Sequence, residues 1–253
     1  MNKEDSMKDE NFNQEVINRV NSYHKDSKLK DSVKKAAFEM TRAKYTYNFN
    51  YLGRPIFQNP ADMQVIQEIM YEYKPDLVIE TGIARGGSLI YYASLMVLLE
   101  YCGKIKNGEV IGIDIDIREH NKKEILKHPL NKKIVMLEGS SIDDNIIKEV
   151  KKLAEYKKRV LVILDSNHTH DHVLGELRAY APLVSKNGYC IVCDTAIENL
   201  DLNWSDRLWG KGNSPMSALF EYLKEDDSFK IDNFYELKSL ITAATNGFLK
   251  KIK

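Results

Sequence analysis

The feature that most constrains the fold of this 253-residue chain is a set of five short apolar runs, rich in β-branched residues. The runs are Asp76–Glu80, Glu109–Asp114, Lys133–Leu137, Val160–Asp165 and Tyr189–Asp194. Their hydrophobicity is continuous rather than alternating, which indicates strands buried on both faces. Helical patterns separate them, near residues 86–101, 119–127, 143–157 and 170–181. This alternation predicts a doubly wound, mainly parallel α/β sheet with right-handed crossovers.

The two ends of the chain carry different patterns. Residues 11 to 45 indicate two amphipathic helices, which would form either a cap over a site or an oligomerisation arm. Near the other end, Phe229–Tyr235 and Leu240–Ile252 indicate two more strands, the second interrupted by a turn at Asn246-Gly247. Five parallel strands followed by a β-pair match the Rossmann-like, seven-stranded plan of class I methyltransferases, although a fold alone does not define a function. We expect a helical extension over residues 1–50 and one domain over residues 51–253.

Composition argues against several classes of protein. The chain has 37 Lys and Arg against 37 Asp and Glu, so it lacks the basic charge of a nucleic-acid or membrane-surface binder. Its apolar runs fall far short of the roughly 20 residues of a membrane span, and no secretory signal is seen. Three cysteines are too few for a disulfide framework, and buried reduced thiols are favoured over a redox or zinc role for Cys190 and Cys193. We therefore expect a cytoplasmic protein with a small-molecule partner.

The first run is followed by a glycine-bearing turn, ETGIARGGS at residues 80–88, that leads into a helix. In an open α/β sheet, ligands lie beyond the carboxyl ends of the strands. Gly82 permits a tight turn, and Gly86-Gly87 let a ligand approach the helix start, where free N–H groups favour a carboxylate or phosphate. The spacing is neither a dinucleotide fingerprint nor a P-loop, which argues against both ligand classes. The alternative is that the glycines only shape the turn.

The second and third runs end in polar residues that suit a nucleoside. Asp114 closes the second run and can accept two hydrogen bonds from a ribose diol, whereas Asp116 is interpreted as a solvated loop charge. The third run is followed by Gly139-Ser140-Ser141, a small loop that could flank an adenine ring. The two serines could equally cap the next helix.

The fourth and fifth runs end in Asp165 and Asp194, which should emerge side by side. Two converging carboxylates repel each other unless a cation, a proton or a substrate group lies between them, and their oxygen atoms suit Mg²⁺. Three of the six histidines follow at 168, 170 and 172. His168 is the candidate general base, because an imidazole titrates near neutrality. His170 and His172 are expected to begin an exposed helix.

Several segments occur together, in order, from about residue 50 to the end of the chain. They are Gly53-Arg54-Pro55, Asn59-Pro60-Ala61-Asp62, KPDLVIETGIARGGS (74–88), VIGIDID (110–116), LEGSSIDD (137–144), ILDSNHTHDHVLGELRAYAPLVSKNGYCIVCDT (163–195) and NGFLKKI (246–252). They resemble the cephalosporin hydroxylase-like/rhamnosyl O-methyltransferase family. The resemblance implies a class I methyltransferase fold that binds S-adenosylmethionine (SAM), O-methylation of sugar or natural-product hydroxyls, and often a bound divalent ion.

The resemblance also implies roles for particular residues. The cofactor-binding set falls on Glu80, Gly82, Gly86, Gly87, Ser88, Asp114, Gly139, Ser140, Ser141 and Asp165, the metal aspartates fall on Asp165 and Asp194, and the base histidine, three residues after the first aspartate, falls on His168.

Cys193 departs from the family pattern, because relatives usually carry an acidic residue there. A thiolate is a poor ligand for Mg²⁺, so the metal site has one oxygen donor fewer unless Asn167 or Glu198 substitutes.

We favour a SAM-dependent O-methyltransferase that is assisted by a bound Mg²⁺ ion, with Asp165 and His168 as catalytic residues. Its acceptor would be a sugar, a nucleotide-linked or phosphorylated precursor of a surface polysaccharide, or a natural product. An iron-dependent hydroxylase using His168, His170 and Asp171, and a non-catalytic SAM-binding subunit, are the alternatives. We also expect a homo-oligomer.

Residues 198–215 contain both tryptophans, Trp204 and Trp209, and would form either a lid over the acceptor pocket or an ordinary surface loop. Anion contacts for a phosphorylated acceptor would come from Arg85, Arg207 and Lys211.

Overall fold

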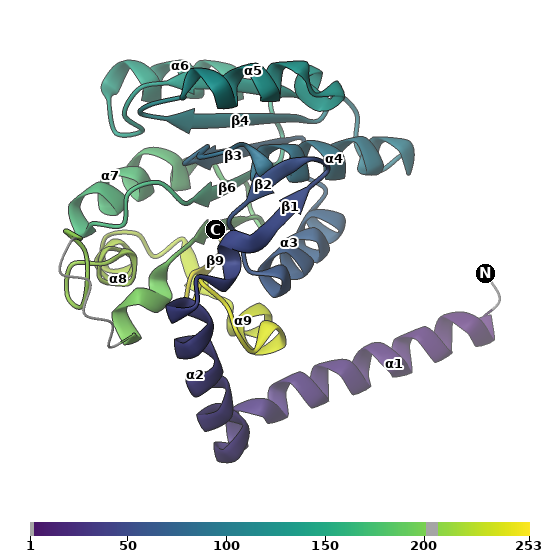
Figure 1. Ribbon diagram of the computed structural model, residues 1–253. Coiled ribbons are helices and arrows are strands. Elements are labelled where there is room, and N and C mark those ends of the chain that lie inside the picture. Colours follow the sequence, from purple (N-terminus) through teal and green to yellow (C-terminus); the bar gives the residue numbers. More distant parts are fainter. Residues whose placement is uncertain (1–2, 201–206) are drawn as a thin grey trace.

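The computed structural model describes residues 3–200 and 207–253 and has a seven-stranded sheet at its centre (Figure 1). The strand order is β5-β4-β3-β6-β7-β9-β8. The five parallel strands are β3 (Leu77–Thr81), β4 (Glu109–Asp114), β5 (Ile134–Glu138), β6 (Val160–Leu164) and β7 (Tyr189–Val192). The antiparallel strands are β8 (Phe229–Ile231) and β9 (Phe248–Lys251). The predicted mainly parallel sheet is confirmed.

Helices cover both faces of the sheet, and alternate strand residues enter two separate hydrophobic clusters. Val78 packs in the cluster that contains residues of α3 and α4, whereas the next residue, Ile79, packs in the cluster that contains residues of α6, α7 and α8. The helices around the sheet are α3 (Pro60–Tyr73), α4 (Gly87–Tyr101), α5 (Glu119–Lys127), α6 (Asp144–Ala154), α7 (His170–Tyr180), α8 (Pro215–Glu225) and α9 (Asn233–Ser239). Burial on both faces explains why the strands are uniformly apolar.

The strand order reverses between β3 and β6, where the site is expected. The chain runs from β3 outward to β5 and then returns to the other side of β3. The ends of β3 and β6 touch, since Asp165 N donates to the Thr81 carbonyl at 3.0 Å. A β-carbon on Gly82 would lie 2.0 Å from the Asp165 carbonyl oxygen, so only glycine allows this approach. A switch point of this kind opens a crevice above the strand ends.

The C-terminal prediction was partly wrong. Residues 233–239 form α9 instead of extending the strand that begins at Phe229, and of the long second strand only Phe248–Lys251 is extended. Asp232 caps α9 by accepting a hydrogen bond from Phe234 N, and Asn246 has a positive φ of 58°, which makes the predicted turn. The sequence patterns also left three elements unpredicted: α3, α8 and a two-stranded hairpin of β1 (Phe49–Tyr51) and β2 (Arg54–Ile56).

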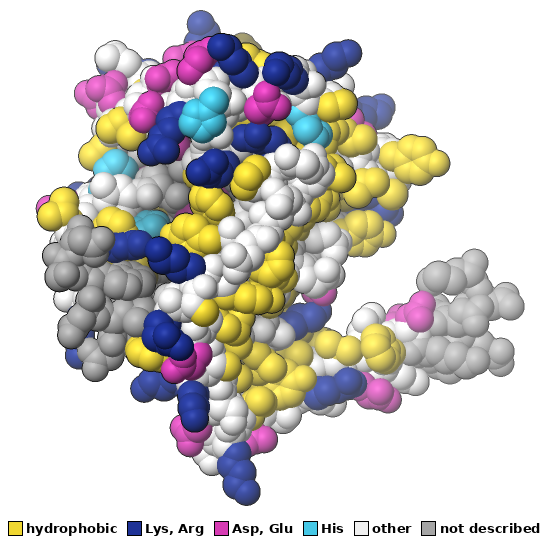
Figure 2. All heavy atoms as spheres, viewed as in Figure 1, with side chains coloured by type: hydrophobic (Ala, Val, Ile, Leu, Met, Phe, Trp, Pro, Cys, Tyr) yellow, Lys and Arg dark blue, Asp and Glu magenta, His cyan; other side chains and the backbone are white. Residues whose placement is uncertain are grey.

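The predicted N-terminal helices are present as α1 (Lys3–Ser22) and α2 (Ser27–Arg42). Figure 1 shows α1 extending away from the sheet, while α2 lies near the strand ends. No α2 residue is buried, and hydrophobic side chains gather between α2 and the body of the protein (Figure 2). Within the described residues, no helix is long and apolar enough to cross a bilayer.

Candidate active site

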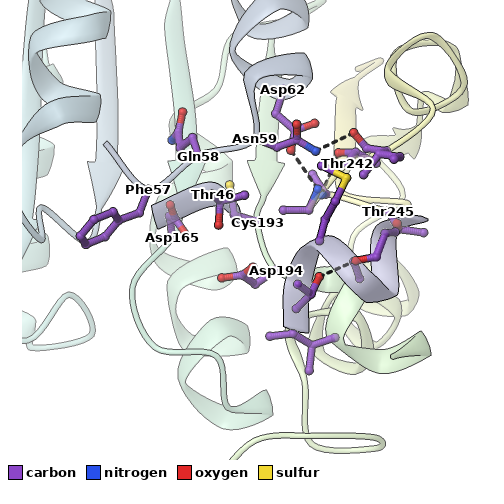
Figure 3. A pocket seen from close by; sticks show the side chains of 18 of the residues that line it. Thr46, Phe57, Gln58, Asn59, Asp62, Asp165, Cys193, Asp194, Thr242 and Thr245 are labelled. Carbon is purple, nitrogen blue, oxygen red and sulfur yellow. Dashed lines mark hydrogen bonds between the residues drawn. The ribbon is translucent and has the colours of Figure 1, made fainter. Parts of the chain in front are cut away.

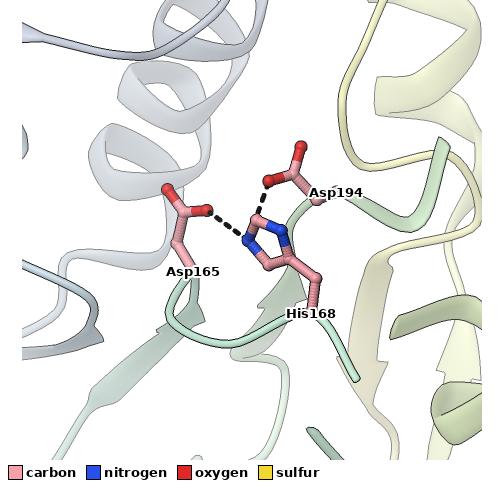
Figure 4. Close-up of side chains that lie close together, drawn as sticks. All are labelled: Asp165, His168 and Asp194. Atoms are coloured by element: carbon pink, nitrogen blue, oxygen red, sulfur yellow. Dashed lines mark ion pairs between the residues drawn. The ribbon is translucent and has the colours of Figure 1, made fainter. Parts of the chain in front are cut away.

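Three side chains meet beyond the ends of β6 and β7. His168 Nε2 forms an ion pair with Asp194 Oδ2 at 2.9 Å and lies 4.0 Å from Asp165 Oδ1 (Figure 4). Each of the three residues offers one possible metal-ligand atom, and these three atoms lie within 4.8 Å of one another. The strand ends therefore bring together the two aspartates and the histidine that the sequence singled out.

The three groups alter one another's protonation. Burial acts to lower the pKa of His168, but the charge and hydrogen bond of Asp194 outweigh it and raise that pKa to about 9. Burial acts to raise the pKa of Asp194, yet His168 holds it below its ordinary value. Burial, followed by repulsion from Asp194, raises the pKa of Asp165 to about 8. The group thus holds an imidazolium paired with Asp194 beside a carboxyl that resists ionisation.

These residues border a cavity of about 1080 Å³ (Figure 3). Gly82, Gly87 and Ser88 of the glycine turn line it together with Asp165, His168, Cys193 and Asp194. Residues of α2 and of the segment 236–245 line the opposite parts of its wall. The cavity thus joins the predicted cofactor turn to the predicted catalytic residues.

The glycine turn is held from below by two carboxylates. Glu80 is fully buried and accepts a hydrogen bond from Ser88 Oγ at 2.8 Å. Burial, followed by repulsion from Asp165, raises the pKa of Glu80 well above its ordinary value. Asp114 Oδ2 accepts from the N–H groups of Ile83 and Ala84, at 2.9 and 3.0 Å. Neither Glu80 nor Asp114 lines the cavity as the structure describes it. Both fix the shape of the turn, and their contact with a cofactor stays a prediction.

The remaining glycines of the set have separate roles. Gly86, with φ of 80°, ends the turn and caps α4, and a β-carbon on Gly87 would lie 2.2 Å from the Pro55 carbonyl oxygen. Gly139 has φ of 155° and follows β5. The helix after this loop is capped by Asp143, so neither Ser140 nor Ser141 is its cap.

Ser141 is buried in a polar cluster beneath the loop. Its Oγ donates to Glu176 Oε1 at 2.5 Å and lies 2.9 Å from His172 Nε2. Ser166 Oγ donates to the same Glu176 oxygen at 2.6 Å. Ser140 and Ser141 do not line the described cavity, and their contact with an adenine ring stays a prediction.

His170 and His172 are less exposed than expected. His170 Nδ1 lies 2.8 Å from Ser217 Oγ and its Nε2 lies 3.3 Å from Glu221, so it joins α7 to α8. His172 belongs to the Ser141 cluster, and Asp171 is exposed. These residues do not converge with His168, so the ligand set of the hydroxylase alternative is not assembled.

Cys193 lines the cavity but is outside the group formed by Asp165, His168 and Asp194. Burial, followed by repulsion from Asp165 and Asp194, raises the pKa of its thiol well above the ordinary value. Asn167 and Glu198, the residues suggested as replacement oxygen ligands for the metal, form other hydrogen bonds. Asn167 Oδ1 accepts from Thr169 N at 2.9 Å, and Glu198 accepts from Gly212 N and Ser214 Oγ.

Part of the segment 198–215 covers the site. The Trp209 ring packs edge-on against His168, with 5.0 Å between ring centroids, and the Arg207 guanidinium lies 4.9 Å from the Trp209 ring. Arg207 and Arg85 line the cavity, whereas Lys211 does not. Trp204 lies outside the described residues. The contact with His168 favours the lid interpretation.

Three cavity residues at the start of α3 were missed by the sequence analysis. Gln58, Asn59 and Asp62 are polar and buried, and all three line the cavity (Figure 3). They follow β2 rather than a strand of the main sheet, so an analysis of sheet edges could not find them.

Comparison with known proteins agrees with this geometry. Residues 43–252 match the family model described as rhamnosyl O-methyltransferase/CmcI. A rhamnosyl O-methyltransferase of Mycobacterium tuberculosis is 32% identical over 201 residues, covering 79% of this chain and 76% of the relative. The Mycobacterium leprae protein of the same name is 30% identical and covers 79% of this chain and 81% of the relative.

Solved structures share the fold. The CmcI apo structure superposes with a TM-score of 0.58 at 21% identity, covering 82% of this chain and 77% of that one. A CmcI structure described as a Mg–SAM form gives 0.54 at 19% identity, over 82% and 78%.

Proposed function

The chain belongs to the rhamnosyl O-methyltransferase/CmcI family of SAM-dependent O-methyltransferases, and on that premise we propose that it methylates a hydroxyl of a sugar or natural-product acceptor, with assistance from a divalent ion. The observation that carries this proposal is the convergence of Asp165, His168 and Asp194 on the cavity that the glycine turn also lines. Its similarity to a rhamnosyl O-methyltransferase and to a CmcI structure with Mg and SAM supports the proposal.

We assign each part of the reaction to a region in or beside the cavity. We place the cofactor's carboxylate at the start of α4 beside Ser88, and its ribose near Asp114. Bound SAM supplies a methyl group activated by a sulfonium, so the protein's task is to orient the acceptor and accept its proton. Asp165 and Asp194 offer carboxylate oxygens that suit Mg²⁺, which would lower the pKa of an acceptor hydroxyl.

His168 is the proposed base, and it can accept a proton only as a neutral imidazole. Asp194 favours its protonated form. The base therefore becomes available when a cation balances the negative charge of Asp194. Trp209, packed against the imidazole, limits its movement and its access to water.

A transfer assay tests the proposal. Purified protein is incubated with methyl-labelled SAM and a panel of glycosides that includes rhamnosides, with MgCl₂ or with EDTA. We expect label in at least one glycoside and a loss of transfer in EDTA. Absence of SAM binding by calorimetry would contradict the proposed function, and binding of 2-oxoglutarate with iron would favour the hydroxylase alternative.

The finer features are also part of the proposal. A precursor of a surface polysaccharide is the acceptor class that we favour, and Arg85 and Arg207 at the cavity wall would suit a phosphorylated one. A homo-oligomer is proposed from the exposed apolar side chains of α1, such as Phe12, which is 59% exposed.

A further inference from the structure

The side of α2 that lines the cavity carries two lysines beside its apolar residues. Lys30 and Lys34 both line the cavity, and residues four apart lie on the same side of a helix. Figure 2 shows Lys and Arg side chains along α2. Arg42, in the last turn, pairs with Glu39, whereas neither lysine forms an ion pair with any residue that the structure describes. The two charges are therefore open to a ligand.

Other elements add cations to the same cavity. Lys44 follows α2 and Arg85 belongs to the glycine turn; both are exposed and line the cavity. Arg207 also lines it, and lies 4.9 Å from the Trp209 ring that packs on His168. Because the whole chain has 37 basic and 37 acidic residues, this group of cations does not reflect a basic composition.

The acidic residues of the wall balance these cations only in part. Asp194 is engaged in the ion pair of the catalytic group. Burial raises the pKa of Asp165 to about 8 and that of Asp62 to about 7, so both carboxyls resist ionisation. Asp31 is the one acidic residue of the described wall that is exposed. The cavity thus favours an anion on the side of α2.

The cofactor does not supply this anion. Its one carboxylate is assigned to the start of α4, and its sulfonium and ammonium groups are positive. The acceptor is then the molecule that carries the negative charge. Phosphate oxygens suit lysine ammonium groups, because the hydrogen bonds between them are strengthened by both charges.

The cavity is long enough to separate the charged group of the acceptor from its reacting hydroxyl. Residues of α2 from Leu29 to Thr41 line it, which corresponds to about 18 Å along the helix axis. One sugar ring is much shorter than this. A sugar ring near His168 therefore leaves room for a phosphate group against α2.

We propose that the acceptor is a phosphorylated sugar and that Lys30 and Lys34 bind its phosphate or diphosphate group. This inference rests on the proposed function and narrows it to one class of acceptor. In this arrangement α2 is an acceptor-binding element as well as a wall of the cavity.

Calorimetry on the protein saturated with S-adenosylhomocysteine and Mg²⁺ tests the charge of the acceptor. Rhamnose 1-phosphate and a nucleoside-diphosphate rhamnose are compared with neutral methyl rhamnoside. We expect the phosphorylated compounds to bind at least about tenfold more tightly than the neutral one. Tighter binding of the nucleotide would identify a nucleotide-linked sugar as the acceptor. Equal binding of the two phosphorylated compounds would identify the phosphate alone as the recognised group.

A double variant tests the role of α2. Lys30→Gln with Lys34→Gln removes both charges and keeps polar side chains that suit a helix. We expect the Kd of the phosphorylated compounds to rise about tenfold and that of methyl rhamnoside to stay unchanged. Lys28→Gln with Lys35→Gln, on the same helix but outside the cavity lining, is the matched control and should bind like the wild type.

Three results would overturn the proposal: equal affinity of the wild type for neutral and phosphorylated rhamnosides, an unchanged Kd in the Lys30 and Lys34 variant, or an equal loss in that variant and its control. The proposed function survives each of them if the labelled methyl group of SAM is still transferred to a neutral glycoside. If the wild type does not bind S-adenosylhomocysteine, both fail.

Discussion

His168, Asp165 and Asp194 cannot be assigned charges independently, because each alters the pKa of the others. Asp194 keeps His168 protonated, with a pKa of about 9, and Asp165, with a pKa of about 8, stays largely protonated at neutrality. One imidazolium paired with one carboxylate carries no net charge. The site therefore avoids burying an unbalanced charge when no ligand is bound.

Replacing His168 should affect chemistry more than binding. We expect His168→Ala to lower turnover by ~10²–10⁴, because the acceptor hydroxyl loses its base. Affinity for S-adenosylhomocysteine should be nearly unchanged, since no cofactor contact is assigned to this side chain. Steady-state rates and calorimetry on the same preparation measure both effects. Wild-type turnover in the variant would remove His168 from the mechanism.

Asp62 should make stability depend on pH. Burial, opposed by hydrogen bonds from Thr242 and from the Ala243 backbone, raises the pKa of this carboxyl from 3.8 to about 7. The folded state thus favours the protonated form, and the stability that this gives is present below about pH 4 and lost as the pH rises through 7. Asp62→Asn cannot ionise, so it should match the wild type near pH 4 and be more stable by about 1–3 kcal/mol at pH 8. Urea unfolding at both pH values measures the difference. An equal difference at both would contradict the assignment.

The sequence predicts some site residues and not others for a physical reason. Asp165 and Asp194 end buried strands, so the sheet itself determines that they meet. Gln58 and Asp62 follow a small hairpin outside the sheet, and the local signal, Asn59-Pro60 with an acidic residue in the first turn, indicates only a helix start. Asp114 shows a different limit, because its strand position was predictable but its bonds to the glycine turn were not.

Among the elements, α7 connects the two loops that flank the proposed cofactor. Its Glu176 is fully buried, and one carboxylate oxygen accepts hydrogen bonds from Ser141, after β5, and from Ser166, after β6. Glu176 therefore links the loop that carries the candidate catalytic residues to the loop that we assign to adenine. Glu176 acts through these serines and is a positioning residue.

Replacing Glu176 with an apolar residue should loosen the loops that follow β5 and β6. In Glu176→Leu the buried Ser141 hydroxyl and the partly buried Ser166 hydroxyl lose an acceptor. We expect a loss of about 1–3 kcal/mol in the free energy of unfolding, together with weaker binding of S-adenosylhomocysteine. Glu176→Gln keeps one acceptor oxygen and should recover most of the affinity. Urea unfolding and calorimetry measure the two effects. Equal affinity in the wild type and Glu176→Leu would show that α7 does not position these loops.

The elements that were predicted correctly are those with the clearest hydrophobic pattern. The parallel strands are continuous apolar runs, and burial on both faces forces that composition. In contrast, residues 233–239 include aromatic and charged side chains that suit an edge strand, and the Asp232 cap with its tertiary contacts makes them helical. Such contacts cannot be read from a local pattern.

In the whole molecule, α1 extends away from the sheet, whereas α2 borders the main cavity (Figure 1). α2 lies between the main cavity and a smaller groove of about 500 Å³, and Val33 and Met40 line both. α1 contacts α9, and its Phe12 and Ile17 side chains are exposed. Apolar side chains that the chain itself leaves exposed are suited to contact with another copy of the chain.

Placing charges at Phe12 and Ile17 should change the assembly and leave the sheet domain folded. We expect light scattering to give a multimer for the wild type and a lower mass for the double variant Phe12→Asp with Ile17→Asp, because two charges then face the apolar contact. Circular dichroism is the control for folding. An unchanged mass in the variant would show that α1 does not mediate assembly.

The most direct measurement of the central claim is a crystal structure of the protein with S-adenosylhomocysteine and Mg²⁺. The account predicts the amino-acid part beside Ser88, the ribose near Asp114 and the sulfur facing Asp165, His168 and Asp194. A nucleoside bound outside the main cavity, or a sulfur directed away from these three residues, would contradict it.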